Sequence, residues 1–105
     1  RSKVEETALS VDHKIMETNF FSAVHLTKAV LPGMIENKRG NIIVINSVQG
    51  KIGIPFRAAY SASKHALTGY FDSLRAEIAC HNISVTSVFP GYVNTKLSLN
   101  ALTGK

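Results

Sequence analysis

The chain has 105 residues and a net charge of +5, and it is 45% hydrophobic and 18% charged. This usage is typical of globular proteins and excludes a disordered, collagen-like or coiled-coil chain, and no run approaches the ~20 apolar residues of a membrane helix. The longest basic run is Lys38-Arg39, so we expect a solvated basic surface and no nucleic-acid partner, because nucleic-acid binders usually concentrate their charge in a stripe or patch.

The first expected element is a long amphipathic helix. Apolar residues recur at three- and four-residue steps over residues 12–37, which predicts a helix with a broad buried face. Ser10 or Asp12 is expected to cap its start. Pro32 lies inside the pattern and is expected to kink the helix at or just before Leu31, because it lacks an N–H and its ring clashes with the preceding turn.

A stop signal and a β-branched run follow this helix. Residues 38–40, a basic pair and a glycine, predict its end. Residues 41–46 are apolar without alternation, which favours a strand buried on both faces, as in a parallel sheet. Residues 47–57 contain two glycines and a proline and predict a loop.

The second half of the chain repeats the order of helix and strand. Residues 58–81 predict a helix rich in small residues, and residues 83–89 predict a second apolar strand. Residues 92–105 are interpreted as a tail with one helical turn. A helix between two buried strands predicts a parallel crossover and an α/β fold. Because two parallel strands alone make a marginal sheet, residues 1–105 are interpreted as one incomplete domain.

Three side chains form a candidate catalytic group. Ser47 follows the first strand, at the edge where open α/β sheets place their ligands. Tyr60 and Lys64 are four residues apart on the second helix, so both project from one face. An ammonium beside a phenol favours the phenolate, which suits Tyr60 to proton exchange with a carbonyl or alcohol oxygen. The structural alternative is a turn serine and a half-buried tyrosine beside a snorkelling lysine.

The remaining titratable residues predict no further site. His13, His25, His65 and His81 share no constellation in the sequence, so no metal site is expected. Cys80 is the only cysteine and is interpreted as a small apolar side chain near a helix end.

Several segments together resemble the second half of a short-chain dehydrogenase/reductase. They are residues 40–47 (GNIIVINS), 60–64 (YSASK) and 90–95 (PGYVNT). Asn19, in ETNFF, matches the helix asparagine of the family and completes an Asn–Ser–Tyr–Lys tetrad. The segments QGK, IPFR and SKHA resemble the member 7 subgroup of the family, especially its B type. The resemblance covers essentially the whole chain and implies a partial Rossmann-like, doubly wound parallel sheet.

The resemblance also implies a role for each matching residue. Tyr60 would exchange a proton with the substrate oxygen, which Ser47 would orient. Lys64 would favour the phenolate and bind the cofactor ribose, and Asn19 would hold a water that connects Lys64 to solvent. The residues implied in cofactor binding are Tyr60, Lys64, Pro90, Gly91, Val93 and Thr95. Asn46 stands where many family members have a second serine, and it is assigned no role.

The implied activity is NADP(H)-dependent interconversion of a carbonyl and a secondary alcohol, with NAD also possible, on a lipid-like or steroid-like substrate. The glycine-rich TGxxxGxG turn and the NNAG segment of the family are absent from the sequence, so these residues alone are expected to be inactive. The alternative is a truncated, catalytically silent interaction or dimerisation module. The resemblance further implies a homodimer through helices 12–37 and 58–81. It also implies an endoplasmic reticulum membrane location; the chain has no targeting segment, and a cytoplasmic location is the alternative.

Overall fold

The computed structural model describes residues 2–47 and 53–90. The helical first half consists of η1 (Val4–Glu6), α1 (Leu9–Met16), the π-helical turn η2 (Glu17–Phe21) and α2 (Ser22–Asn37). The second half consists of β1 (Gly40–Ile45), α3 (Ala58–Ile78), the 3-10 turn η4 (Ala79–His81) and β2 (Ile83–Val88). The predicted order of helix, strand, helix and strand is therefore confirmed, and the predicted tail at residues 92–105 lies outside the described residues.

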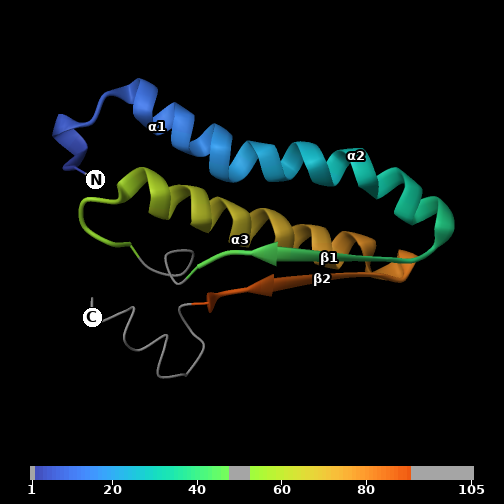
Figure 1. Ribbon diagram of the computed structural model, residues 1–105. Helices are drawn as coiled ribbons and strands as arrows, with labels where there is room; N and C mark the ends of the chain where they lie inside the picture. Colours follow the sequence, from blue (N-terminus) through green and yellow to red (C-terminus); the bar gives the residue numbers. More distant parts are fainter. Residues whose placement is uncertain (1, 48–52, 91–105) are drawn as a thin grey trace.

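The two strands pair in parallel, as predicted. Their register runs from Gly40 opposite Ile83 to Ile45 opposite Val88, and the N–H of Asn46 extends the ladder by donating to the Val88 carbonyl at 2.7 Å. The helices form layers over one face of this sheet. In Figure 1, α3 runs alongside the two strands; α1 and η2 pack along α3, and α2 is in contact with β1.

The core lies between α3 and the sheet. α3 presents an apolar stripe with three- and four-residue spacing to the strands, as amphipathic helices do. Phe71 is the most buried of these side chains, with 1% of its surface exposed, and burying a side chain of this size contributes about 1.5–3 kcal/mol. The buried apolar residues of this core are Val44, Leu67, Phe71, Leu74, Ile78, Ile83 and Val85.

The opposite face of β1 is open. Ile43 and Ile45 are 60% and 62% exposed, whereas Val44 between them is buried. Side chains of a strand alternate between its two faces, and within the described residues the helices cover one of them. The prediction that β1 is buried on both faces requires further elements over the face that carries Ile43 and Ile45, and it stays a prediction.

The first helix differs from the prediction at its start. α1 begins at Leu9, and its N-cap is Ala8, which has no side-chain capping bond. Ser10 and Asp12 lie inside the first turns of α1 and cap nothing. The predicted cap is therefore wrong, and the helix begins three residues earlier than its apolar periodicity indicates.

The expected single helix also changes geometry, at a place the sequence pattern does not mark. Residues Glu17–Phe21 form a π-helical turn, and the α-helical geometry resumes at Ser22. Beyond it, α2 is helical from Ser22 through Pro32 to Asn37, and the kink expected near Leu31 stays a prediction. The described irregularity therefore lies at Glu17–Phe21, more than two turns before the proline.

The end of α2 is made by Lys38 and not by the following glycine. Lys38 adopts a left-handed conformation with φ 56°. Its N–H donates to Ile35 O and the N–H of Arg39 donates to Met34 O, both at 3.2 Å, which is the Schellman pattern. Gly40 instead begins β1, where a Cβ would lie 2.5 Å from the Met34 sulfur, so its role is close packing.

The end of α3 is tied to the end of α2. Asn82, which follows the 3-10 turn η4, is left-handed with φ 61°, and its Nδ2 donates to the Lys38 carbonyl at 3.1 Å. The two residues precede β2 and β1, so this bond joins the starts of both strands. No helix in residues 2–47 and 53–90 combines the length and apolar character that a membrane span needs.

Candidate active site

Two of the predicted catalytic residues, Ser47 and Tyr60, lie at the same end of the molecule. α1 and α3 begin near the end toward which β1 points (Figure 1). Ser47 lies two residues beyond β1, and Tyr60 lies in the first turn of α3. This edge, at the carboxyl ends of parallel strands, is where open α/β sheets bind ligands.

A tight turn sets the start of α3. The Arg57 N–H donates to the Ile54 carbonyl at 3.2 Å, which closes a four-residue turn with Pro55 and Phe56 at its centre. Phe56 has φ 66°. Proline followed by a positive φ is the arrangement of a type II turn, in which glycine or asparagine usually takes the second place. α3 begins directly after this strained turn, at Ala58, and Tyr60 lies in its first helical turn.

Tyr60 and Lys64 project from the same face of α3, as predicted. The Lys64 Nζ lies 5.3 Å from the centre of the Tyr60 ring, within the range of a cation–π contact. Both side chains are half-buried. Among the residues that the structure describes, the Lys64 ammonium forms no ion pair.

Asn19 contacts the same helix through a buried serine. Its Nδ2 donates to Ser63 Oγ at 3.2 Å, and Ser63 Oγ donates to the Tyr60 carbonyl at 2.7 Å. Ser63 has no exposed surface. Asn19 is at the centre of the π-helical turn, a geometry often found at functional sites. Asn19 and Lys64 also line a shared groove of about 350 Å³ between α2 and β1.

Asn46 connects β1 to α3 and was not predicted to have a role. Its Nδ2 donates to the Lys64 carbonyl at 3.0 Å and to Thr68 Oγ1 at 2.9 Å, and its Oδ1 accepts the Ser47 N–H at 2.9 Å. The sequence could have indicated a role for Asn46, because this residue is two positions after Val44 and therefore on the same, core-facing side of the strand. A polar side chain at a core-facing position needs partners.

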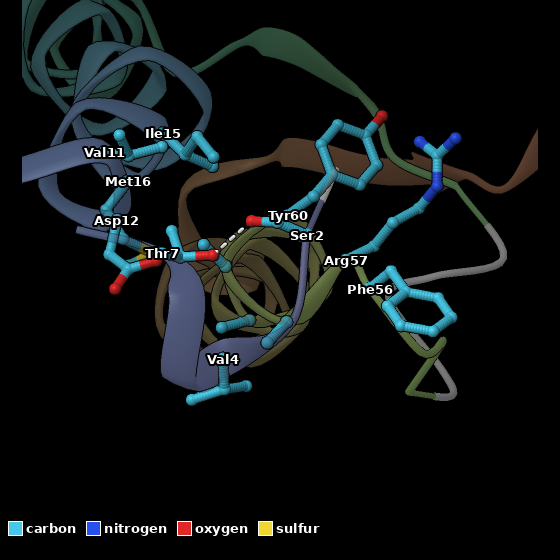
Figure 2. Close-up of a pocket in the computed structure, with 13 residues that line it drawn as sticks. Ser2, Val4, Thr7, Val11, Asp12, Ile15, Met16, Phe56, Arg57 and Tyr60 are labelled. Atoms are coloured by element: carbon cyan, nitrogen blue, oxygen red, sulfur yellow. Dashed lines mark hydrogen bonds between the residues drawn. The ribbon is translucent and has the colours of Figure 1, made fainter. Parts of the chain in front are cut away.

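A groove of about 470 Å³ lies beside Tyr60, between the start of α3 and α1. Figure 2 shows residues of α1 on one side and Phe56, Arg57 and Tyr60 on the other. Its lining is largely apolar, with one acidic and one basic side chain. The residues that line it are Ser2, Val4, Thr7, Val11, Asp12, Ile15, Met16, Phe56, Arg57, Ala58, Ala59, Tyr60 and Ala62.

The cofactor segment is described only at its start. Pro90 follows β2 by two residues, at the same edge of the sheet as Ser47. Gly91, Val93 and Thr95 lie outside the described residues. Within residues 2–47 and 53–90, no three histidine, cysteine or acidic side chains gather as metal ligands.

The chain belongs to the short-chain dehydrogenase family, whose model matches residues 1–104. It is similar to "Dehydrogenase/reductase SDR family member 7B" of Xenopus laevis, with 60% identity over 104 residues, 99% of this chain and 32% of that protein. The mouse protein of that name is 56% identical over 98% of this chain and 32% of its own length. The Drosophila melanogaster "Dehydrogenase/reductase SDR family protein 7-like" is 59% identical over 99% of this chain and 32% of its own length. This chain thus spans about a third of these relatives, and the resemblance to the family and its member 7 subgroup is confirmed.

Solved structures confirm the fold class. A short-chain dehydrogenase from Streptomyces avermitilis matches with a TM-score of 0.81 and 33% identity, over 84% of this chain and 32% of that one. A metagenomic short-chain oxidoreductase in complex with NADP matches with a TM-score of 0.82 and 33% identity, over 90% of this chain and 42% of that one. The helices and the parallel strands described here are therefore part of a Rossmann-like α/β fold.

Proposed function

We propose that this chain is the catalytic part of an NADP(H)-dependent oxidoreductase that interconverts a carbonyl and a secondary alcohol. Membership of the short-chain dehydrogenase family supports oxidoreductase chemistry. The observation that carries the specific proposal is the Lys64 Nζ, 5.3 Å from the Tyr60 ring centre, at the sheet edge where Ser47 follows β1. A tyrosine hydroxyl beside a bound carbonyl or alcohol can exchange a proton with its oxygen, and the Lys64 ammonium is placed to bind a cofactor next to it.

Tyr60 and Ser47 have different roles at the substrate oxygen. Tyr60 donates a proton to this oxygen when a carbonyl is reduced and accepts it when an alcohol is oxidised. Ser47 holds the same oxygen by a hydrogen bond from its hydroxyl, which fixes the distance for proton transfer. Asn19 maintains the start of α3 through Ser63 and holds a water that returns protons from solvent to Lys64.

The residues present fit a nicotinamide cofactor at this edge. The Lys64 ammonium has no carboxylate partner among the described residues, so it can donate to a ribose hydroxyl while it faces Tyr60. Pro90, Gly91, Val93 and Thr95 would line the nicotinamide and its phosphates. The bound nicotinamide would supply or accept the hydride. NADP is proposed over NAD, and a family relative binds NADP in its solved structure.

The groove beside Tyr60 supports a substrate with a large apolar part. Phe56, Val11 and Ile15 line it with apolar surface, which suits a lipid-like or steroid-like carbonyl compound, since ligand sites are mostly apolar with a few fixed polar groups. We further propose a homodimer through the faces of α1–α2 and α3, and a location at the endoplasmic reticulum membrane. Sedimentation of the purified full-length protein and imaging of a tagged copy in cells test these two proposals.

The test of the function is Tyr60→Phe in the full-length protein that contains this chain, with Tyr70→Phe as the matched control. Tyr70 is on the same helix but packs edge-on against Phe20 and Phe71. Removal of a general acid typically costs about 10²–10⁴-fold in rate, so we expect that loss of kcat for Tyr60→Phe, with cofactor affinity retained. Tyr70→Phe is expected to keep normal turnover. Equal turnover of the two variants contradicts the assignment, and loss of cofactor binding together with turnover indicates misfolding instead.

A further inference from the structure

Asn46 is a buried polar residue that the proposed reaction does not use. Only 3% of its surface is exposed, and it lies on the core-facing side of the first strand. An amide in such a place destabilises the fold unless its hydrogen bonds are made. Among the described residues, every buried side-chain nitrogen or oxygen has a hydrogen-bond partner. The amide group of Asn46 is therefore fully hydrogen-bonded within the fold.

Its contacts join the two elements that carry the candidate catalytic side chains. Toward α3, Nδ2 donates both of its hydrogens, one to the Lys64 carbonyl and one to Thr68 Oγ1. Thr68 Oγ1 in turn donates to the same Lys64 carbonyl at 3.1 Å. Toward the loop, Oδ1 accepts the Ser47 N–H. Both donors and the acceptor of the amide are therefore used, with Ser47 on one side and Lys64 on the other.

We propose that Asn46 is a positioning residue of the active site, which holds Ser47 at a fixed place relative to Lys64 and Tyr60. Ser47 lies two residues beyond the end of β1. The bond from its N–H to Asn46 Oδ1 contributes to its position, and the two bonds from Asn46 Nδ2 connect that position to α3, the helix that carries Lys64. The proposal rests on the proposed function, because it gives Asn46 a role in that reaction.

Because the Asn46 amide connects Ser47 to α3, its loss is expected to lower the kcat of the folded protein and not only the stability of the fold. Loss of the amide removes the connection between Ser47 and the Lys64 turn of α3, and a misplacement of about 1 Å can cost about 100-fold in rate. A purely structural residue would lower the population of folded protein and leave the turnover of the folded fraction unchanged. The distinction is therefore measurable in kcat.

The experiment uses the full-length protein and compares Asn46→Leu, which keeps the size but removes all three bonds, with Leu74→Ala. Leu74 is buried in the same core but lies ten residues further along α3 than Lys64, away from the site. We expect Asn46→Leu to lower kcat about 10- to 100-fold, with the KM for cofactor nearly unchanged. Leu74→Ala is expected to lower the melting temperature at least as much and to keep normal kcat.

A second variant and a second measurement keep the test decisive. Thr68→Val removes one bond to Asn46 with little change in shape, and we expect a smaller loss of kcat than in Asn46→Leu; it replaces that variant if Asn46→Leu does not fold. Amide hydrogen exchange is expected to be faster at Ser47 in the Asn46 variant, relative to the ladder amides of β1. Unchanged exchange at Ser47, normal kcat in the folded variant, or an equal loss in Leu74→Ala would overturn the proposal.

Failure of the proposed function gives a different result. If the parent protein shows no nicotinamide-dependent turnover, or if Tyr60→Phe keeps it, the oxidoreductase assignment fails. The exchange rate at Ser47 still decides whether Asn46 holds that residue in place.

Discussion

The link from Asn19 through Ser63 to Tyr60 predicts a coupled loss of stability. Ser63→Ala removes two hydrogen bonds, from Asn19 Nδ2 at 3.2 Å and to the Tyr60 carbonyl at 2.7 Å. Each bond contributes about 0.5–1.5 kcal/mol net, and alanine regains about 0.5 kcal/mol of helix propensity over serine. We therefore expect Ser63→Ala to lower the free energy of unfolding by about 1–2 kcal/mol.

The coupling is measured by a double-mutant cycle with Asn19→Ala. Both single variants lose the bond between Asn19 and Ser63, so the double variant should be about 1 kcal/mol more stable than the sum of the two losses predicts. The propensity contributions of each substitution cancel in the cycle. Urea unfolding of the full-length protein, followed by circular dichroism and by tyrosine fluorescence, measures the four free energies and checks for a two-state transition.

The result that would refute this reasoning is additivity within about 0.3 kcal/mol. Additive losses would mean that the two side chains stabilise the fold separately and that the π-helical turn is not held on α3 by this bond. In that case Asn19 would influence the proposed reaction only through water.

Two further predictions concern the end of α2 and the extent of the active unit. Lys38→Gly is expected to raise the melting temperature, because relief of the left-handed strain of about 1–2 kcal/mol exceeds the added entropy of glycine, about 0.5–1 kcal/mol; Lys28→Gly, the same change inside α2, is expected to lower it. The 105-residue chain by itself is expected to show no nicotinamide-dependent turnover in an absorbance assay, because its sequence lacks the glycine-rich turn that cradles a pyrophosphate. Turnover that Tyr60→Phe abolishes in this short chain would show that residues 1–105 hold a complete site.

Local patterns in the sequence were sufficient to predict the order of the helices and strands and the proximity of Tyr60 and Lys64. Side chains four residues apart share a helix face whatever surrounds the helix, so their proximity follows from helical geometry alone. The β-branched run before Ser47 likewise predicts a strand of a parallel sheet, and the structure confirms the pairing. The packing partners of β1 could not be predicted in this way, because they depend on which elements cover each of its faces.

What the sequence by itself determined is the set of short-range relations: which segments coil, which extend, and which side chains share a helix face. The tertiary structure alone decided the long-range contacts, of which Asn46 is the clearest case, since its partners on α3 are 18 and 22 residues away. It also decided that Asn19 lies in a π-helical turn against Ser63, 44 residues further along. Periodicity reports only which side of an element is apolar, whereas a buried polar group takes its partners from whatever element packs against it.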